Sequence, residues 1–165
     1  MADVMVKVDG LDAIVRKMEQ LPERFVRRGL KRALRKGANV IRNGARTNAK
    51  RIDDPATSEV IAKNIVTQGM SARRERAIGG IGVRVGVLGG SKSKKGGGAY
   101  ATGGDKSNPG GDTWYWRLLE FGTSKMAAKP IMRPAMAQHA MGAYDAFANS
   151  AEGELDKELT KLGAS

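Results

Sequence analysis

The first hydrophobic residues of the chain recur at every second position. In the run VMVKVDG at residues 4–10, three valines alternate with methionine, lysine and aspartate before a glycine ends the run. This alternation predicts a short strand with one buried face. Residues 13–20 then favour a helix, which Asp12 can cap and which Pro22 ends or restarts.

From residue 23 to residue 50 the period becomes that of an amphipathic helix. One broad face collects the apolar and small residues Val26, Leu30, Ala33, Leu34, Gly37, Val40, Ile41 and Gly44. A narrower basic stripe on the opposite face collects Arg24, Arg28, Lys31, Arg35, Arg42 and Arg46. The pattern predicts a long helix, in which the glycines at 37 and 44 let another element approach closely.

The pattern in the middle of the chain is typical of a β-hairpin. Turn-forming residues at 53–55 include two adjacent aspartates, which suit a turn better than a metal site because further ligands are missing nearby. A short helix or strand entry leads into a strand over KNIVTQ, residues 63–68. A polar connection at 71–80 precedes a second strand at 81–88, where Ile and Val alternate with Gly and Arg.

Residues 89–111 are rich in glycine and carry Lys92, Lys94 and Lys95. Such a segment buries too little apolar surface to offset the entropy of ordering it. The sequence therefore predicts a mobile Gly/Lys-rich loop, which would become ordered against a neighbouring subunit or a polyanion.

The segment DTWYWRLLEFG, residues 112–122, holds both tryptophans of the chain. A short helix capped by Asp112 or Thr113 and ended by Gly122 is one interpretation, and a strand is the other. Either way, the tryptophans are predicted to anchor the core rather than an interface.

A last helix begins near Met132, with Pro134 in its first turn, where proline is tolerated. Its predicted apolar stripe contains Met136, Ala140, Ala143 and Phe147. Gly153 would bend or break this helix, and His139 lies off the stripe, which predicts an exposed polar residue. Together the elements predict one α+β domain over residues 1–165: a small antiparallel sheet packed against a long amphipathic helix and a C-terminal helix.

The composition excludes several classes of functional site. The 165 residues include no cysteine and one histidine, which excludes disulfides and thiol nucleophiles and makes a histidine-based triad or transition-metal site hard to assemble. We expect no cofactor. Neither a signal peptide nor a membrane span is predicted. The net charge of +12 favours contact with a polyanion or an acidic protein, although an ordinary solvated basic surface would give the same balance.

One segment carries a more specific pattern. After Tyr115 an acid, an aromatic, a glycine and a threonine follow in a row, and a spacer then leads to a proline, two apolar residues and Arg-Pro-Ala. These positions are Tyr115, Glu120, Phe121, Gly122, Thr123, Pro130, Ile131, Met132, Arg133, Pro134 and Ala135. With this motif and its order of elements, the sequence resembles the neck or tail-completion proteins of long-tailed bacteriophages.

The resemblance implies a structural role without enzymatic chemistry. Such proteins complete the tail and join it to the DNA-filled head, in a ring around the DNA channel. The implied partners are further copies in a six-fold ring, the adjoining head-completion and tail-terminator or tail-tube proteins, and DNA contacted without sequence readout. The implied location is the virion neck, after assembly in the host cytoplasm. The sequence lacks the family's Thr-Gly step after the long helix, and Ile131 and Met132 stand where an aromatic is usual.

Alternatives stay open at this point. A tail terminator that caps the tail tube is of similar size, and a basic nucleic-acid-binding protein would carry the same stripe. An enzyme would need Glu120 with Asp112 or His139 for acid–base work, and no motif supports this. We instead expect Glu120 to accept hydrogen bonds from backbone amides of its turn, or to pair with Arg133 or with a basic residue of a neighbouring subunit.

Overall fold

The computed structural model describes residues 11–53, 60–88 and 108–163. The predicted strand at 4–10 and the lysines of the Gly/Lys-rich segment lie outside the described residues. In the described part, helices predominate and the only sheet has two strands.

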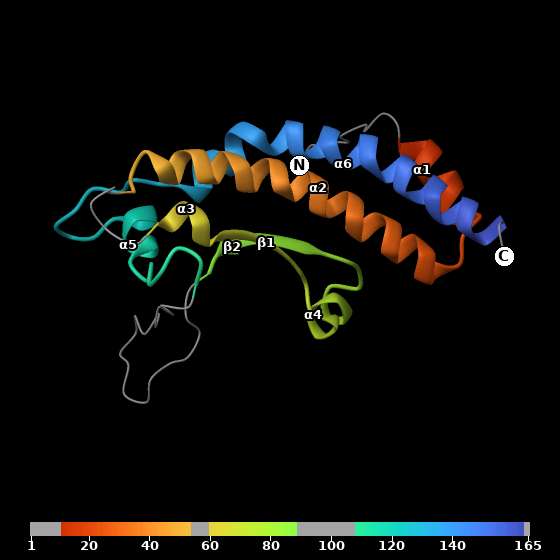
Figure 1. The fold of residues 1–165 in the computed structure, drawn as a ribbon, viewed down its shortest axis with the longest axis horizontal. Helices are drawn as coiled ribbons and strands as arrows, with labels where there is room; N and C mark the ends of the chain where they lie inside the picture. The colour runs from red at the N-terminus through yellow and green to blue at the C-terminus, as the bar shows by residue number, and fades with distance from the viewer. Residues whose placement is uncertain (1–10, 54–59, 89–107, 164–165) are drawn as a thin grey trace, which may run out of the picture.

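Two long helices form the body of the molecule. Helix α2 (Glu23–Lys50) and helix α6 (Met132–Gly163) lie side by side and run in opposite directions (Figure 1). The bounds of α2 are those predicted, because Pro22 stops the preceding turn and an unbroken amphipathic period follows. Helix α1 (Leu11–Glu19) packs against the C-terminal part of α6, where Lys17 Nζ lies 2.9 Å from Glu152 Oε1.

Small residues let the two long helices approach closely. A Cβ atom added to Gly37 would lie 2.6 Å from the backbone oxygen of Ala143, and one added to Gly44 would lie 2.1 Å from the His139 ring. A Cβ at Gly29 would meet Leu155 at 3.2 Å. The close approach predicted for residues 37 and 44 is confirmed, and the partner is α6.

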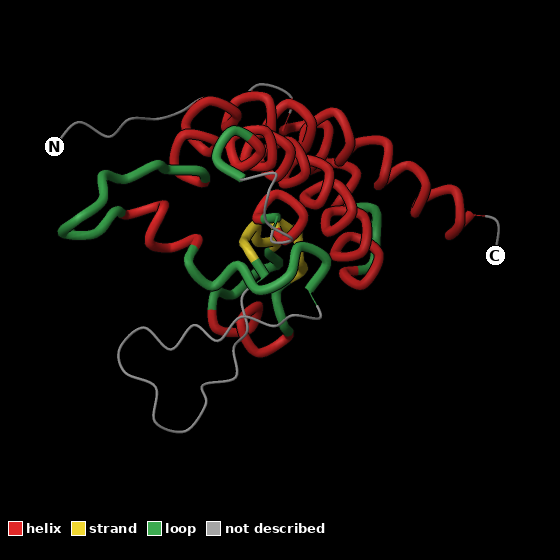
Figure 2. Tube along the Cα trace, turned by 60° about the vertical axis from the view of Figure 1, so that its left-hand side comes forward, coloured by secondary structure: helices red, strands yellow, loops and turns green. Residues whose placement is uncertain are grey.

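The hairpin lies along α2 on the side away from α6 (Figure 1). Strand β1 (Ile65–Gly69) pairs antiparallel with β2 (Val83–Val87), in a register that sets Ile65 opposite Val87. Helix α3 (Ile61–Asn64) leads into β1. Figure 2, turned from the first view, shows the short strands against the much larger helical part. The predicted α+β fold class is confirmed.

The connection between the strands contains a helix that the sequence did not predict. Helix α4 (Ala72–Ala77) begins after Ser71, whose hydroxyl oxygen accepts a hydrogen bond from the backbone amide of Arg74. In the sequence the segment has a polar pattern because a helix of six residues has only a small apolar face. Its single buried residue is Glu75, and the partners of that carboxylate lie on α2.

The segment 112–122 contains a short helix and not a strand. Helix α5 (Trp116–Phe121) ends at Gly122, as predicted, with a φ of 76°. The predicted caps are wrong: Tyr115 occupies the N-cap position, and Thr113 is buried in a hydrogen bond with Asn64. Tyr115 and Trp116 pack against the core, whereas Trp114 is 44% exposed and does not anchor it.

Helix α6 continues through Gly153, so this glycine does not break it. Its predicted buried stripe is partly wrong. Ala143 is buried and Phe147 is half-buried, but Met136 and Ala140 are exposed. Buried apolar residues of α6 are Ala135, Ala143, Ala151 and Leu155. Alanines rather than methionines face α2 because the two backbones are too close for long side chains.

His139 is also corrected by the structure. It lies in the seam between the long helices, with its ring against Gly44, and is half-buried rather than exposed. His139 fits into the seam because Gly44 of α2 has no side chain. The spacing of residues along α6 alone does not indicate this contact between helices.

Candidate functional site

The predicted motif forms a joint between helices α5 and α6. We call it the Glu120 joint: Glu120, the loop 122–131 and the first turn of α6. The Glu120 side chain is 2% exposed, and its carboxylate accepts hydrogen bonds from three consecutive backbone amides. The donor–acceptor distances are 2.6 Å for Ile131, 2.8 Å for Met132 and 3.0 Å for Arg133.

These amides belong to the start of α6, which begins at Met132. The first amides of a helix have no partner within the helix, and the helix dipole favours a negative charge there. Glu120 supplies both the acceptor and the charge from another helix. Pro134, the third residue of α6, has no N–H that would need a partner. The joint thus fixes where α6 begins and how it meets α5.

Arg133 completes the joint. Its Nε lies 3.3 Å from Glu120 Oε1, and its guanidinium also donates to the backbone oxygen of Glu120. Burial raises the pKa of the Glu120 carboxyl, but the hydrogen bonds from the amides of Met132, Ile131 and Arg133 outweigh burial, so the net pKa is lowered. Glu120 therefore has the two intramolecular partners that the sequence predicted for it, and a carboxylate that stays ionised is no general acid at neutral pH.

The loop of the joint presents its tip to solvent. A Cβ on Gly122 would lie 2.9 Å from Met126 O and 2.9 Å from Ala128 N, so the chain folds back on itself at this glycine. Thr123 pairs with Met126 in an isolated bridge, and its hydroxyl oxygen accepts from the amide of Lys125. Pro130 is exposed in the return segment.

Phe121 presents an aromatic ring at the surface of the joint. Its side chain is 68% exposed, and it lies under the Arg133 guanidinium at 5.3 Å. The cation–π contact with Arg133 holds this ring in place. An apolar ring kept at the surface beside a rigid turn is suited to contact with another protein.

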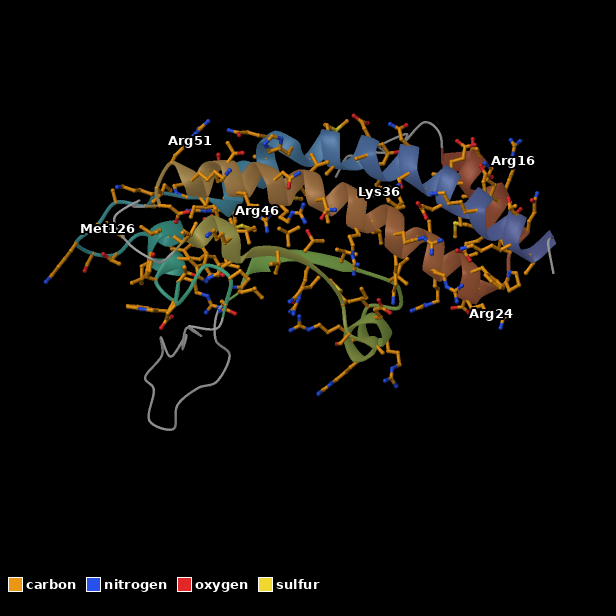
Figure 3. The ribbon with its side chains drawn as sticks, viewed as in Figure 1. Arg16, Arg24, Lys36, Arg46, Arg51 and Met126 are labelled. Atoms are coloured by element: carbon orange, nitrogen blue, oxygen red, sulfur yellow. The ribbon has the colours of Figure 1, made fainter. Side chains whose placement is uncertain are left out.

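The basic stripe does not stay together as one surface. Figure 3 places Arg24 near one end of α2 and Arg46 toward the other. Lys31 Nζ lies 2.8 Å from Glu75 Oε1, and Arg28 lies 3.7 Å from Glu158 Oε2. The acids come from α4 and α6, far away in the sequence.

The remaining stripe residues have other surroundings. Arg24 lies over the Phe25 ring at 4.7 Å, and Arg35 lies beside Gly69 of β1. Arg42 donates to the Asn43 side chain, and Arg46 Nε donates to the backbone oxygen of Ile65 at 3.0 Å. The stripe thus faces the hairpin over part of its length. Lys92, Lys94 and Lys95 lie outside the described residues.

Sequence reasoning missed the buried acids that pair with α2. Glu154 accepts from Arg32 and Lys36, and Glu158 accepts from Arg32. Hydrogen bonds from Lys157 and Arg32 lower the pKa of Glu154 to about 2. The sequence signal for Glu154 and Glu158 was their spacing of four residues, which places both side chains on one face of a helix.

Asn64 was also missed. Its side chain is fully buried and holds the segment before α5: Oδ1 accepts from Gly110 N at 2.7 Å, and Nδ2 donates to Gly111 O at 2.9 Å. Nδ2 also donates to Thr113 Oγ1 at 2.7 Å. Residues 108–111, at the end of the predicted mobile loop, are thereby tied to α3. Asp53, whose oxygens accept from the amides of Ile61 and Ala62, does the same for the turn before α3.

Metal and membrane sites are not evident in the part of the chain that the structure describes. No group of three acidic or histidine side chains there is arranged to hold a metal ion. None of the described helices is both long and apolar enough to cross a bilayer.

Comparison with known proteins gives one family. The sequence profile described as "Bacteriophage HK97-gp10, putative tail-component" matches residues 12–122, about two thirds of the chain. The chain belongs to this family. The match runs from α1 to Gly122 and so includes all of α2, the hairpin and Glu120, whereas α6 lies beyond it. The resemblance found in the sequence is thereby confirmed at the level of a phage tail component. Searches of curated proteins and of solved structures give no match.

Proposed function

We propose that this protein is a structural subunit of the phage neck, which completes the tail and joins it to the DNA-filled head as part of a ring around the DNA channel. The observation that carries the proposal is the family match over residues 12–122, which makes the chain a tail component of the virion. The proposal includes no catalytic role.

The elongated shape of the molecule supports a ring. Exposed apolar side chains occur in elements at both ends of the helix pair (Figure 1): Phe121 ends α5 and Met126 lies in the loop after it, whereas Val15 belongs to α1 and Leu162 to the last turn of α6. A head-to-tail contact joins two different surfaces of each copy and closes into a ring when the rotation allows it. We propose a ring of six copies, in which the Glu120 joint of one subunit contacts the α1 end of the next.

The Glu120 joint would supply the rigidity that such a contact needs. The two ends of the loop 122–130 are tied together by the bonds from Glu120 to the start of α6 and by the bond from Lys129 N to Leu119 O, at 2.8 Å. An interface formed from ordered residues loses less conformational entropy on binding. The proposed neighbours along the axis are head-completion and tail-terminator or tail-tube proteins, with assembly in the host cytoplasm.

Electron microscopy of a phage that lacks this gene tests the role. We expect filled heads and separate tails of normal length that do not join. Normal virions would contradict the proposal, and tails of uncontrolled length would reassign the protein to tail termination. In complemented phage, symmetry analysis of the neck counts the copies, and a number other than six would reject the proposed ring.

Two variants examine the joint in the same assay. Phe121→Ser leaves the bonds of Glu120 intact, so we expect a folded protein that fails to join heads to tails. Glu120→Gln removes the charge at the start of α6 and should lower both stability and joining. If Glu120→Gln left folding and assembly unchanged, the role given to Glu120 would be wrong.

A further inference from the structure

A groove lies between the C-terminal half of α2 and the segment that leads into β1. Its volume is about 650 Å³. Three of its lining residues are cations, Arg46 and Lys50 from α2 and Lys63 from α3. The other lining residues are Asn43, Thr47, Val60, Ala62, Val66 and Pro109. None of these described residues is acidic.

The charge of the groove is not neutralised by the described residues around it. Arg42, Arg46, Lys50 and Lys63 form no ion pair with any acid in ranges 11–53, 60–88 and 108–163. Asp53, a described acid nearby in the sequence, has both carboxylate oxygens engaged by the amides at the start of α3.

Arg42 reports the same excess of positive charge. Burial lowers the pKa of its guanidinium, and the like charge of Arg46 lowers it further. Repulsion between neighbouring cations is relieved when an anion binds between or beside them. The surroundings of Arg42 and Arg46 thus favour an added negative charge.

The cations that α2 contributes are also arranged in a row. Arg46 and Lys50 are one helical turn apart, about 6 Å along the axis of α2. Lys63 adds a third charge from another helix, α3. Arg46 is held by its Nε bond to Ile65 O, so its terminal nitrogens are placed for a ligand. A linear anion with repeated charges matches a row of this kind.

The chemistry of the groove favours nucleic acid over protein. The buried centre of a protein interface is depleted of lysine and enriched in aromatic residues, whereas interfaces with DNA are polar and strongly positive. This groove has two lysines, an arginine and no aromatic residue. The exposed apolar side chains Phe121 and Met126 are not among its lining residues, so the candidate protein contact is elsewhere.

We propose that Arg46, Lys50 and Lys63, flanked by Arg42, form a binding site for the phosphate backbone of DNA, without sequence readout. The site deepens the proposed function and rests on it for its setting, since a subunit around a DNA channel would meet such a backbone. Binding itself is a property of the purified protein and is measured apart from assembly.

The test is a fluorescence anisotropy titration of a mixed-sequence duplex DNA against the full-length protein over a range of salt concentrations. The double variant Lys50→Gln/Lys63→Gln removes two charges from the groove. The matched control Arg16→Gln/Arg24→Gln removes two exposed charges near the other end of the molecule, as Figure 3 shows. Circular dichroism confirms that both variants are folded.

For the groove variant we expect affinity to fall by about tenfold or more at low salt. The slope of log K against log salt should decrease by about 2, roughly one for each lysine that no longer neutralises a phosphate. The control should keep the wild-type slope. Equal loss of affinity in both variants would show that only net charge matters and would overturn the site, as would a wild-type protein that does not bind at low salt.

A competition arm decides between DNA and an acidic protein. Polyglutamate at the same concentration of charge should displace the duplex poorly, because carboxylates on a flexible chain do not reproduce a row of phosphates. If polyglutamate competed equally, the groove would be reassigned to an acidic protein partner. If DNA binding failed while tails still joined heads, this inference alone would fall and the neck role would stand.

Discussion

The two halves of α2 carry the same kind of charge in opposite surroundings. Between residues 23 and 36, cations meet three buried carboxylates, Glu75 from α4 and Glu154 and Glu158 from α6. Between residues 42 and 50, the cations meet no acid of the described residues, and Arg46 and Lys50 line a groove instead. The sequence shows one basic stripe, whereas the structure divides it into cations that hold the fold together and cations that are available to a ligand.

The difference follows from what the neighbouring elements contribute. A carboxylate buried without a partner is strongly unfavourable, so each buried glutamate requires its cations. Glu158 is fully buried and Glu154 is 5% exposed, and Arg32 donates to both. The C-terminal half of α2 contacts the start of α6 as well, but its Arg46 lies against β1, whose backbone offers an acceptor but no charge.

The largest effect is expected from removing the acids of the first half. The double variant Glu154→Gln/Glu158→Gln leaves Arg32 without charged partners and buries two amides, which should lower the free energy of unfolding by about 2 to 4 kcal/mol. Urea unfolding followed by circular dichroism measures this loss. The control Glu152→Gln/Asp156→Gln makes the same charge change at exposed positions of α6 and should cost much less. Equal losses would show that the two halves do not differ in this way.

A second variant tests the packing that both halves share. Gly37→Ala would force a Cβ to within 2.6 Å of the Ala143 oxygen, so the helices must separate. We expect a loss of about 2 kcal/mol in the free energy of unfolding, even though alanine favours helix. Thermal unfolding of Gly153→Ala is the control: no atom lies within 4 Å of its Cβ, and that variant should be stabilised by about 0.5 to 1 kcal/mol. A neutral Gly37→Ala would contradict the close seam.

Acid should weaken the first half selectively. The pKa of Glu154 is lowered to about 2 in the folded protein, below the value of about 4.3 in an unfolded chain. Its stabilisation is therefore present above the unfolded pKa and is lost as pH falls through that window toward 2. Because solvent screens its cations, we expect the single variant Glu154→Gln to remove about 1 kcal/mol of the pH-dependent stability. Chemical denaturation at pH 7 and pH 3 measures the difference, and an unchanged pH dependence would contradict the pairing.

The smallest effect is expected in the second half. Lys50→Gln and Lys63→Gln remove exposed cations that no described acid contacts, so the free energy of unfolding should change by less than about 0.5 kcal/mol. Differential scanning calorimetry of each variant measures this. A loss comparable with that of the Glu154/Glu158 double variant would mean that these lysines are structural and would remove the contrast.

Local patterns were sufficient to predict α2, the two strands and the start of α6, whereas residues 112–122 are compatible in sequence with either a helix or a strand. Pro22 and Gly122 mark the start of α2 and the end of α5 through their own backbone chemistry. The long amphipathic period indicates how far α2 extends. The hydrogen bonds of Glu120 could also be predicted from the sequence. An acid that precedes a glycine turn and a helix start with Arg-Pro indicates a carboxylate that accepts from backbone amides.

The rest depended on contacts between distant residues. Nothing near Glu75 indicates that its partners are Arg27 and Lys31, so neither α4 nor the neutralisation of the stripe could be predicted. Likewise, the place of His139 depends on Gly44, and the exposure of Trp114 depends on how α5 meets the core. Charge periodicity identifies a face of a helix, but only the neighbouring elements decide whether that face is paired.

The most direct test of the divided stripe is lysine footprinting by acetylation and mass spectrometry, with and without excess duplex DNA. One experiment reads both halves of α2, since Lys31 and Lys36 lie in the first and Lys50 in the second, beside Lys63. We predict that DNA protects Lys50 and Lys63 and leaves the reactivity of Lys31 and Lys36 unchanged. Uniform protection of all four lysines, or protection of Lys31 and Lys36 alone, would contradict the account.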